Sequence, residues 1–582
     1  MADLLEHKKI PLHSMIKRTW KYIKKEKAAF IISFILIVIN VLLGVITPRV
    51  SGYFTDYISG SNIVLNHIIV IAAGTFFLAL LSQTCIYVET VVLTKAGQRI
   101  VYQLRMEVFE HVENMSQNQF NDMAVGSLVT RVCSYTSQLS EFFTGTIVKI
   151  GKDFLTVVAT YVWMVVLSPE LGLAMSVVVL LIFIISFFFS KKVHQIFTKE
   201  RAQLSDLNTF LNESLSGMKI IQLFKEEEKY SKIFNNKNND FFKTKYMVTV
   251  AFSIYRPLVS LIYVLTVALI IYSGIILKLS AGIIVSFYLF LNYFFEPIQS
   301  LADSLNHITR AMSSIERLYN LFDIVPEVVD KEGAIDIKEF KGKIEFRNVY
   351  FSYEKDNWIL KNVSFVINPK ETIAFVGATG AGKTTILNLI VRNYEIQSGQ
   401  ILIDDIDINN ITLSSLRRGV GQMLQDVFLF TGTVKDNITL FDDSYSEEEI
   451  EHAIKYVNAD KFINRLDDGL DTQIVERGEN FSTGQRQLLS FARTIIAKPQ
   501  IMILDEATAN IDTETELIIQ ESLLNIKNIG TMLIVAHRLS TIQNADKIIV
   551  LSHGEIIESG NHEELIKKEG YYYNLYKLQF DN

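Results

Sequence analysis

The fold of the second half of this chain is decided by the stretch Gly377-Ala378-Thr379-Gly380-Ala381-Gly382-Lys383-Thr384-Thr385. It matches G-x-x-x-x-G-K-[ST], the pattern of loops that bind phosphate. Residues 372–376 before it have a buried-strand pattern, and residues 386–391 after it begin a helix. The glycines let backbone N–H groups close around phosphate oxygens, and the helix N-terminus adds favourable partial charge. We therefore expect all nine residues to hold a nucleotide, with Lys383 at the β and γ phosphates and Thr384 on magnesium.

A pair of carboxylates follows a second buried-strand pattern. Residues 501–504 are apolar, and Asp505 and Glu506 come directly after them. Ligands of α/β domains bind at the carboxyl ends of strands, so both side chains are expected beside the phosphate loop. Asp505 would hold Mg²⁺, directly or through water, and Glu506 would orient and polarise the attacking water.

Strand-like and helix-like segments alternate around these motifs. Over residues 342–582 this alternation predicts an α/β P-loop ATPase domain. The preceding segment 322–341 is charged, contains Pro326 and lacks long apolar runs, so we interpret it as a linker. A chain of 582 residues is also too long for one ordinary domain.

The first half of the chain carries uncharged apolar runs of the length that crosses a bilayer, about 20 residues in a helix. Two of the runs are shorter and are bounded by charge on each side. One such run could be a buried helix of a soluble protein, whereas the whole series predicts an all-α polytopic membrane domain over residues 28–321. The predicted spans are 28–48, 68–88, 154–168, 171–190, 257–277 and 279–295.

The distribution of Lys and Arg sets the orientation of these spans. The connections 49–67 and 168–170 are short and poor in positive residues, whereas segments 89–153 and 191–256 are long and rich in them. Both termini, the long segments and the ATPase domain are therefore expected in the cytosol of a multi-pass protein of the cell membrane. Residues 1–27 include a basic helix with Trp20, which we expect at the inner membrane interface.

The long cytosolic segments are expected to be helices that continue from the membrane. Pro and Gly are sparse there, and apolar residues recur at helical spacing. Each helix pair needs a turn at its far tip, for which the candidates are Gln117–Val125 and Leu223–Lys229. Tips so far from the membrane suit the transmission of force from a cytosolic domain.

Composition excludes several other classes of protein. The net charge of −7 and the lack of a polybasic arm give no indication of a nucleic-acid partner. Cys85 and Cys133 lack metal-binding spacing and are expected to be buried thiols. The N-terminal apolar run is preceded by a long basic segment and lacks a cleavage pattern, so it is not interpreted as a secretory signal.

The segment Phe481-Ser482-Thr483-Gly484-Gln485 completes the set of motifs. Together with the phosphate loop and the acidic pair, it resembles the signature of the ABC transporter superfamily, specifically of the multidrug and lipid exporter branch, and the resemblance covers essentially the whole chain. It implies that two ATPase domains meet head to tail. Ser482, Gly484 and Gln485 would then contact ATP held by the partner domain, with the helix dipole supplying the attraction.

Further residues match the family pattern in its usual order. The resemblance implies that Tyr353 stacks on adenine, that Gln425 senses Mg²⁺, that Asp512 lies in the loop coupling two ATP sites, and that His537 contacts the γ-phosphate. If they were considered singly, Tyr353 would be interpreted as a core aromatic residue and His537 as a histidine with a structural hydrogen bond. Their order and spacing favour the functional interpretation.

Thr483 departs from the family consensus, which has glycine at this position. A side chain there would crowd the approach of the backbone to phosphate. Because Glu506 is retained, this chain combines a competent phosphate loop with a weakened signature. We therefore expect a heterodimer with a second half-transporter, and a homodimer that tolerates threonine is the alternative.

The resemblance implies ATP-driven export of small amphipathic compounds: drugs, lipids or peptides. ATP binding would close the ATPase domains, and the helical bundle would open outward. An importer built on the exporter fold and an ATP-gated regulator or channel are the alternatives.

Overall fold

The computed structural model describes residues 11–60, 63–354, 357–423, 427–505, 513–527, 529–535 and 542–580. Contacts divide the chain into two compact units. The helical unit comprises Met1–Glu113 and Met123–Ile324, and the α/β unit comprises Asn114–Asp122 and Val325–Asn582. The short segment Asn114–Asp122 thus belongs by its contacts to the α/β unit, although the helical unit flanks it in sequence.

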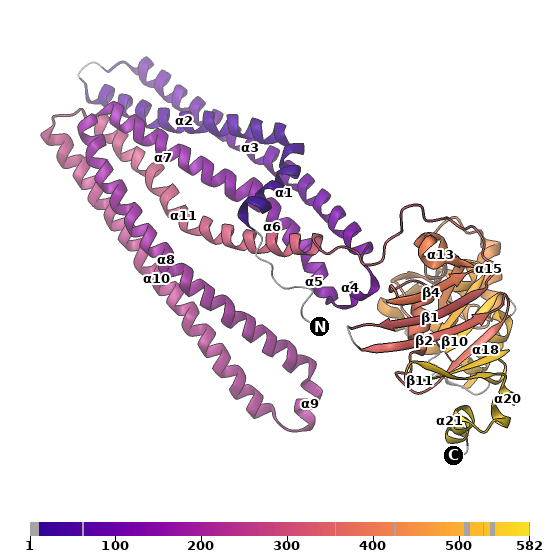
Figure 1. Cartoon of the computed structure of the whole chain (residues 1–582). Coiled ribbons are helices and arrows are strands. Elements are labelled where there is room, and N and C mark those ends of the chain that lie inside the picture. The colour runs from indigo at the N-terminus through magenta and orange to yellow at the C-terminus, as the bar shows by residue number, and fades with distance from the viewer. Residues whose placement is uncertain are drawn as a thin grey trace. The chain divides into compact units, whose positions relative to one another are not determined.

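The helical unit is built of long helices (Figure 1). Several far exceed the roughly 20 residues of a bilayer span, because the apolar runs pass without a break into polar helical sequence. Pro48, Pro257 and Pro297 lie inside helices, which membrane helices tolerate. In chain order the elements are α1 (Leu12–Lys25), α2 (Lys27–Ser59), α3 (Leu65–Glu113), α5 (Val125–Thr130), the π-helix η2 (Arg131–Tyr135), α6 (Thr136–Glu141), the π-helix η3 (Phe142–Thr146), α7 (Ile147–Leu167), α8 (Pro169–Ser216), α9 (Met218–Leu223), α10 (Glu227–Ile276) and α11 (Ala281–Phe322).

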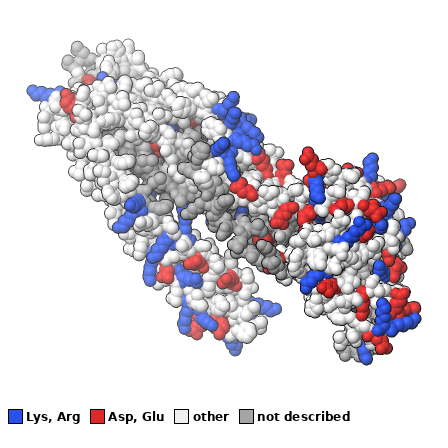
Figure 2. All heavy atoms as spheres, viewed as in Figure 1, with Lys and Arg blue, Asp and Glu red and all other residues white. Residues whose placement is uncertain are grey.

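The predicted spans coincide, within two residues at their ends, with parts of α2, α3, α7, α8, α10 and α11. Among the described residues, five helical stretches are long and apolar enough to cross a membrane, and Ala281–Pro297 of α11 is a shorter apolar stretch. Large apolar side chains such as Phe76, Phe77 and Phe183 are exposed on these helices. In Figure 2 much of the visible face of the helical unit lacks charge, and Lys, Arg, Asp and Glu gather toward the α9 end of α8 and α10. The prediction of an all-α membrane domain is confirmed.

Helices α2 and α11 are fastened together by close packing and a carboxylate cap. A Cβ on Gly282 would overlap the carbonyl oxygen of Gly52, so this approach requires glycine. Asp56 of α2 accepts hydrogen bonds from the backbone N–H of Gly282 (2.6 Å) and from the hydroxyl of Ser280 (2.8 Å). Asp56 therefore caps the N-terminus of α11 together with the N-cap residue Ser280, whose hydroxyl accepts from the backbone N–H of Ile283. A negative charge is favourable at this end of a helix.

The basic helix α1 packs one side against the helical unit. The hydroxyl of Tyr22 donates to Glu107 of α3 at 2.6 Å, and the hydroxyls of Thr19 and Tyr319 of α11 lie 2.8 Å apart. Tyr22 and Thr19 are buried, whereas Trp20 is 58% exposed. The placement of α1 at a membrane surface stays a prediction, and these contacts add that its buried side joins α3 to α11.

The α/β unit contains a mostly parallel sheet and an antiparallel sheet. Within the described residues, the strand orders are β12-β11-β3-β10-β9-β6 and β2-β1-β4-β5, and β7 pairs with β8. The strands are β1 (Ile344–Ser352), β2 (Trp358–Ile367), β3 (Thr372–Val376), β4 (Ser398–Ile403), β5 (Ile406–Asp407), β6 (Val420–Met423), β7 (Gly432–Thr433), β8 (Gln473–Ile474), β9 (Ile501–Asp505), β10 (Thr531–Val535), β11 (Lys547–Ser552) and β12 (Glu555–Gly560). This architecture is the predicted α/β domain.

Helices cover the parallel sheet and complete two cores. Alternate residues of β3 point to opposite faces, so Ala374 and Val376 enter one core while Ile373 and Phe375 enter the other. Strands β3 and β10 are buried along their whole length, as expected for a parallel sheet covered on both faces. The helices of the unit are α4 (Gln117–Asn121), α12 (Lys383–Ile390), α13 (Leu413–Gly419), α14 (Val434–Thr439), α15 (Glu447–Tyr456), α16 (Asp460–Ile463), α17 (Thr483–Ile496), α18 (Thr513–Ile526), α20 (His562–Lys567) and α21 (Tyr571–Phe580), with 3-10 turns at Ile408–Asn410, Gly469–Asp471 and Glu476–Gly478.

Candidate nucleotide-binding site

The predicted phosphate loop joins the carboxyl end of β3 to α12, as the sequence pattern requires. Two positions in it need glycine. A Cβ on Gly377 would overlap the carbonyl oxygen of Leu551, and Gly382 has a φ of +101° with Leu360 only 2.6 Å from the place of a Cβ. Other residues would adopt this backbone only with strain. The loop therefore keeps a bare backbone in front of a helix N-terminus, which is what an anionic phosphate needs.

Lys383 is folded into the phosphate loop. Its Nζ donates hydrogen bonds to the carbonyl oxygens of Gly377 (2.8 Å) and Ala378 (3.0 Å), and the residue is 7% exposed. Burial lowers the pKa of Lys383, while the negative charge of Asp505 acts in the opposite direction. The ammonium is thus held inside the loop by carbonyl oxygens that phosphate oxygens could replace.

Tyr353 brings an aromatic ring beside the first turn of α12. It follows β1 directly, and its hydroxyl lies 3.1 Å from the hydroxyl oxygen of Thr385. The ring packs edge-on against Phe351 and Tyr394, with centroid separations of 4.9 Å and 5.1 Å, and the residue is 42% exposed. An exposed ring face next to the loop suits stacking on a base. Thr384, the predicted Mg²⁺ ligand, is also exposed.

Asp505 lies at the same sheet edge as the phosphate loop. In the strand register, Asp505 is paired with Val535 of β10, and Val535 is paired with Phe375 of β3. Two strand spacings of about 4.8 Å each separate β9 from β3. Asp505 therefore lies roughly 10 Å from Phe375, near the end of β3 that leads into the phosphate loop. Hydroxyl and carboxylate oxygens are the ligands that Mg²⁺ prefers, and Thr384 and Asp505 supply both.

The predicted signature forms the start of α17. Ser482 is the N-cap: its Oγ accepts from the backbone N–H of Gln485 (3.2 Å), and the Gln485 side chain accepts from the backbone N–H of Ser482 (2.9 Å). Gly484 is buried in the first turn, and Thr483 is exposed. Nη2 of Arg486 donates to the Thr483 hydroxyl at 3.3 Å. A threonine side chain therefore stands at the helix N-terminus where the family consensus has none.

Some predicted residues cannot be placed. Glu506, His537, Gln425 and Asp512 lie outside the described residues, so their roles stay predictions. Within the described part of the chain, no group of three or more His, Cys, Asp and Glu side chains forms a candidate metal site.

The first predicted tip contains a short helix, α4, which belongs by its contacts to the α/β unit. Helix α4 begins with a capping box between Ser116 and Gln119. The side-chain amide of Gln119 donates to the carbonyl of Val325 at 2.8 Å. This contact ties the segment Asn114–Asp122 to the start of the chain that leads into the α/β unit.

Helix α4 also contacts Tyr394, a neighbour of Tyr353, the residue expected to stack on the base. Burial raises the pKa of Tyr394, and hydrogen bonding to the Asn121 side chain acts in the opposite direction. Tyr394 in turn packs against Tyr353. Sequence motifs singled out neither Asn121 nor Tyr394, because only the tertiary structure brings them together.

The second predicted tip is the connection between α9 and α10. Leu223 and Phe224 are 70% and 74% exposed there. This end of the helix pair therefore presents apolar side chains on its surface.

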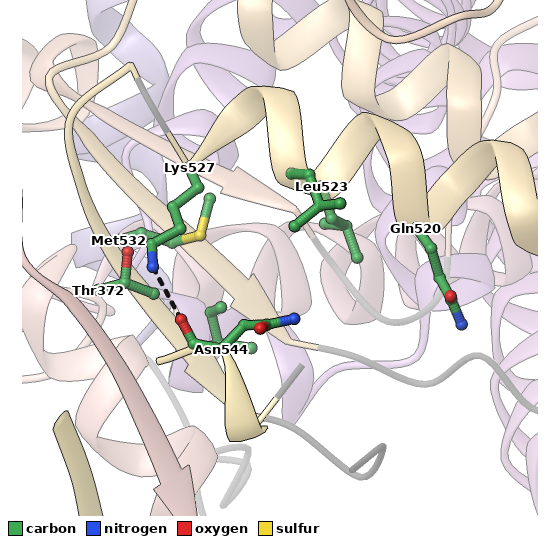
Figure 3. A pocket seen from close by; sticks show the side chains of 8 residues that line it. Thr372, Gln520, Leu523, Lys527, Met532 and Asn544 are labelled. Atoms are coloured by element: carbon green, nitrogen blue, oxygen red, sulfur yellow. Dashed lines mark hydrogen bonds between the residues drawn. The ribbon is translucent and has the colours of Figure 1, made fainter. Parts of the chain in front are cut away.

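A separate cavity lies in the α/β unit between α18 and strands β3 and β10 (Figure 3). Its volume is about 80 Å³, and Leu523, Met532 and Thr372 contribute to its walls. On one side Lys527 Nζ donates to the carbonyl oxygen of Asn544 at 2.7 Å. Thr372 is the first residue of β3, at the end opposite the phosphate loop, so this cavity is not part of the candidate site.

Two protein-family models match the chain. The model described as ABC transporter transmembrane region matches residues 30–298, and the model described as ABC transporter matches residues 360–509. They follow each other in the predicted order.

Curated relatives match along most of the chain. An uncharacterized ABC transporter ATP-binding protein of Bacillus subtilis, YknV, is 37% identical over 97% of this chain and 94% of its own length. A probable multidrug resistance ABC transporter of Bacillus subtilis, YheH, is 35% identical over 85% of this chain and 74% of its own. The ATP-dependent lipid A-core flippase of Syntrophus aciditrophicus is 34% identical over 85% of this chain and 83% of its own.

Among solved structures, a bacterial Atm1-family ABC exporter with ATP bound matches with a TM-score of 0.79. The match covers 95% of this chain and 98% of the other, at 24% sequence identity. At this identity the match establishes the fold.

Proposed function

The chain belongs to the ABC transporter family, with a membrane-spanning region and an ATPase domain on one polypeptide, and we propose that it exports amphipathic compounds across the cytoplasmic membrane as half of a dimer. Drugs, lipids or peptides are the proposed substrates. The fusion of apolar helices of spanning length to the phosphate loop Gly377–Thr385 carries this proposal. In this family such an arrangement couples ATP hydrolysis in the cytosol to transport through the membrane domain.

The direction of transport is proposed from relatives and from domain order. Two of the relatives are named as a probable multidrug resistance ABC transporter and an ATP-dependent lipid A-core flippase. The membrane-spanning region precedes the ATPase domain on one polypeptide, which is the domain order of exporters in this family.

For the ATP cycle, we assign binding of the nucleotide to Gly377–Thr385 with Tyr353 against the base. The tight loop backbone at Gly377 and Gly382, where a Cβ would clash with Leu551 and Leu360, and the ammonium of Lys383 inside the loop fit phosphate. Thr384 and Asp505, with Gln425, would hold Mg²⁺, which neutralises developing charge on the phosphates. Lys383 would reach the β and γ phosphates, Glu506 would orient and polarise the attacking water, and His537 would contact the γ-phosphate.

We assign a second subunit, and favour a different one, to complete the ATP site. Ser482, Gly484 and Gln485 form a helix N-terminus that would face ATP in a partner. Thr483 adds a side chain there, and Arg486 donates to its hydroxyl, which keeps that side chain at the helix start. This chain would therefore contribute its own phosphate loop to the active site and take the signature from its partner.

Exposed apolar residues support dimer formation. Leu223 and Phe224 at the α9–α10 tip are exposed, as are Phe428, Phe430 and Phe441 in the α/β unit. The three phenylalanine rings contact one another in sequence, with centroid separations of 5.1 Å and 6.1 Å. Exposed clusters of this kind mark surfaces that another protein covers.

Transport into inside-out vesicles of the native membrane, which also holds the proposed partner subunit, tests the function and its alternatives. An amphipathic fluorescent dye should accumulate when ATP is added, and Lys383→Met should abolish the accumulation. ATP-dependent loss of preloaded dye would instead indicate the importer. ATP hydrolysis that moves no dye in either direction but opens an ion conductance would indicate the regulator or channel.

A further inference from the structure

A polar cavity lies in the helical unit between η3 and α11. Its volume is about 220 Å³, which is close to that of seven water molecules at roughly 30 Å³ each. An organic group of the size of an amino acid or a lipid headgroup fits such a space. The walls are formed by Gln138, Glu141, Phe142 and Thr146 on one side and by His307, Arg310 and Ala311 of α11 on the other.

The floor and the rim of this cavity differ in character. Thr146 and Ala311 are buried, and Phe142 is half-buried beside them. The side-chain oxygen of Gln138 accepts a hydrogen bond from Ser314 at 2.6 Å, which fixes the amide. The floor therefore offers apolar surface and an oriented amide group.

The rim carries charges of both signs. Glu141, His307 and Arg310 are exposed, and Glu141 Oε1 lies 3.9 Å from His307 Nδ1. The formal charges of Glu141 and Arg310 cancel. A ligand with a single charge can pair with only one of them, whereas a zwitterion can pair with both at once.

The backbone on one side of the cavity is unusual. The π-helix η3 supplies Phe142 and Thr146, and a second π-helix, η2, lies one short helix earlier. π-Helical turns are rare and often occur at functional sites. The wider turn changes which side chains face α11, so Glu141 and Phe142 lie on the cavity side together with Thr146.

We propose that this cavity binds the zwitterionic end of an amphipathic solute. The acidic group lies against Arg310, the primary ammonium lies against Glu141, and the apolar part covers Phe142 and Ala311. The inference rests on the proposed export function, because it narrows the substrate class to molecules that carry both a primary amine and an acidic group. Short apolar peptides with free termini and phosphatidylethanolamine share this chemistry.

Binding to the full chain in micelles of an uncharged maltoside detergent, which offers no competing zwitterion, tests the proposal without ATP. Leucyl-leucine is titrated by calorimetry, with its N-acetyl and C-amide forms as matched controls that each lack one charge. In a second arm, the protein is purified from mixed lipid, and retained phosphatidylethanolamine is compared with retained N-acetylated phosphatidylethanolamine. We expect saturable binding of at least one zwitterion and weaker binding of its blocked form. The arm in which this preference occurs shows whether the ligand is a peptide or a lipid headgroup.

Variants assign this binding to the cavity. Arg310→Gln and Glu141→Gln should each weaken it about fivefold, the effect of losing an exposed ion pair worth about 1 kcal/mol. Arg317→Gln is the control, because Arg317 lies on the same helix but donates to the Tyr135 hydroxyl at 2.9 Å. The double exchange Arg310→Glu with Glu141→Arg should restore binding to within about twofold, because a zwitterion can bind in reverse.

Two results would overturn the proposal: no preference for a zwitterion in either arm, or the same binding in the Arg310 and Glu141 variants as in the parent chain. Unfolding midpoints of all variants identify any that misfold. If a single variant misfolds, the binding measured for the double exchange tests the proposal in its place. Because binding is measured without ATP, it does not depend on turnover. Failure of ATP-driven dye transport with zwitterion binding intact would instead count against export.

Discussion

Replacing Lys383 with methionine tests the phosphate loop most simply, because the side-chain stem is kept and the ammonium is removed. In the structure this ammonium donates two hydrogen bonds within the loop, at 2.8 Å and 3.0 Å. On nucleotide binding it would exchange these carbonyl partners for phosphate oxygens. A hydrogen bond to a charged group contributes about 1.5–3 kcal/mol. Taking the lower figure for two bonds gives about 3 kcal/mol, or roughly 150-fold in Kd.

Titration with a fluorescent ATP analogue in nanodiscs measures this change. Lys461→Met is the matched control, since Lys461 is exposed and pairs with Glu521 at 2.9 Å, and its affinity for the analogue should change less than about twofold. The free protein should lose some thermal stability, because Lys383 also ties the loop together. An unchanged Kd in a folded Lys383→Met protein would refute the role assigned to this side chain.

Three further changes have defined outcomes. In the transporter assembled with its partner subunit, Glu506→Gln should keep ATP binding and lower turnover at least about 100-fold, the contribution of a general base, and turnover that persists would reject the water-polarising role. Asp56→Ala leaves the N-cap Ser280 in place but removes the carboxylate that accepts from Gly282 and Ser280, which should lower stability by about 2 kcal/mol and the unfolding midpoint by several degrees. An unchanged midpoint would show that this carboxylate is dispensable for stability. Burial raises the pKa of Tyr572 to about 12, so the unfolded chain releases this proton first, near its ordinary value of 10. Stability should therefore fall as the pH rises from 10 to 12, and Tyr572→Phe should reduce that fall.

Local patterns predicted much of this structure. The phosphate loop, with its preceding strand and following helix, depends on a few adjacent residues, and the structure has β3 and α12 in those places. The membrane helices were also predicted, because an apolar run of spanning length has few other uses in a chain of this kind. Their great length was expected from helical spacing in the polar segments that follow.

Features that depend on tertiary contact were not predictable from the sequence. Asp56 and Gly282 are 226 positions apart, and only the packing of α2 on α11 makes the aspartate a helix cap. Asn121 reaches Tyr394 in the same way. The expectation of two buried thiols was half right: Cys85 is buried, but Cys133 is exposed in η2. A π-helix has no clear sequence signal, so the side on which Cys133 would point could not be worked out.

The most direct test of the central claim is ATP turnover by this chain purified alone in lipid nanodiscs, measured against Glu506→Gln. The claim is that the chain is a half-transporter with its own competent phosphate loop and a signature weakened by Thr483. It predicts a folded protein that binds ATP but shows negligible Glu506-dependent turnover, and it predicts that Thr483→Gly raises that turnover. Robust Glu506-dependent turnover with Thr483 in place would contradict the requirement for a different partner, and a folded chain that binds no ATP would contradict the assignment of the site itself.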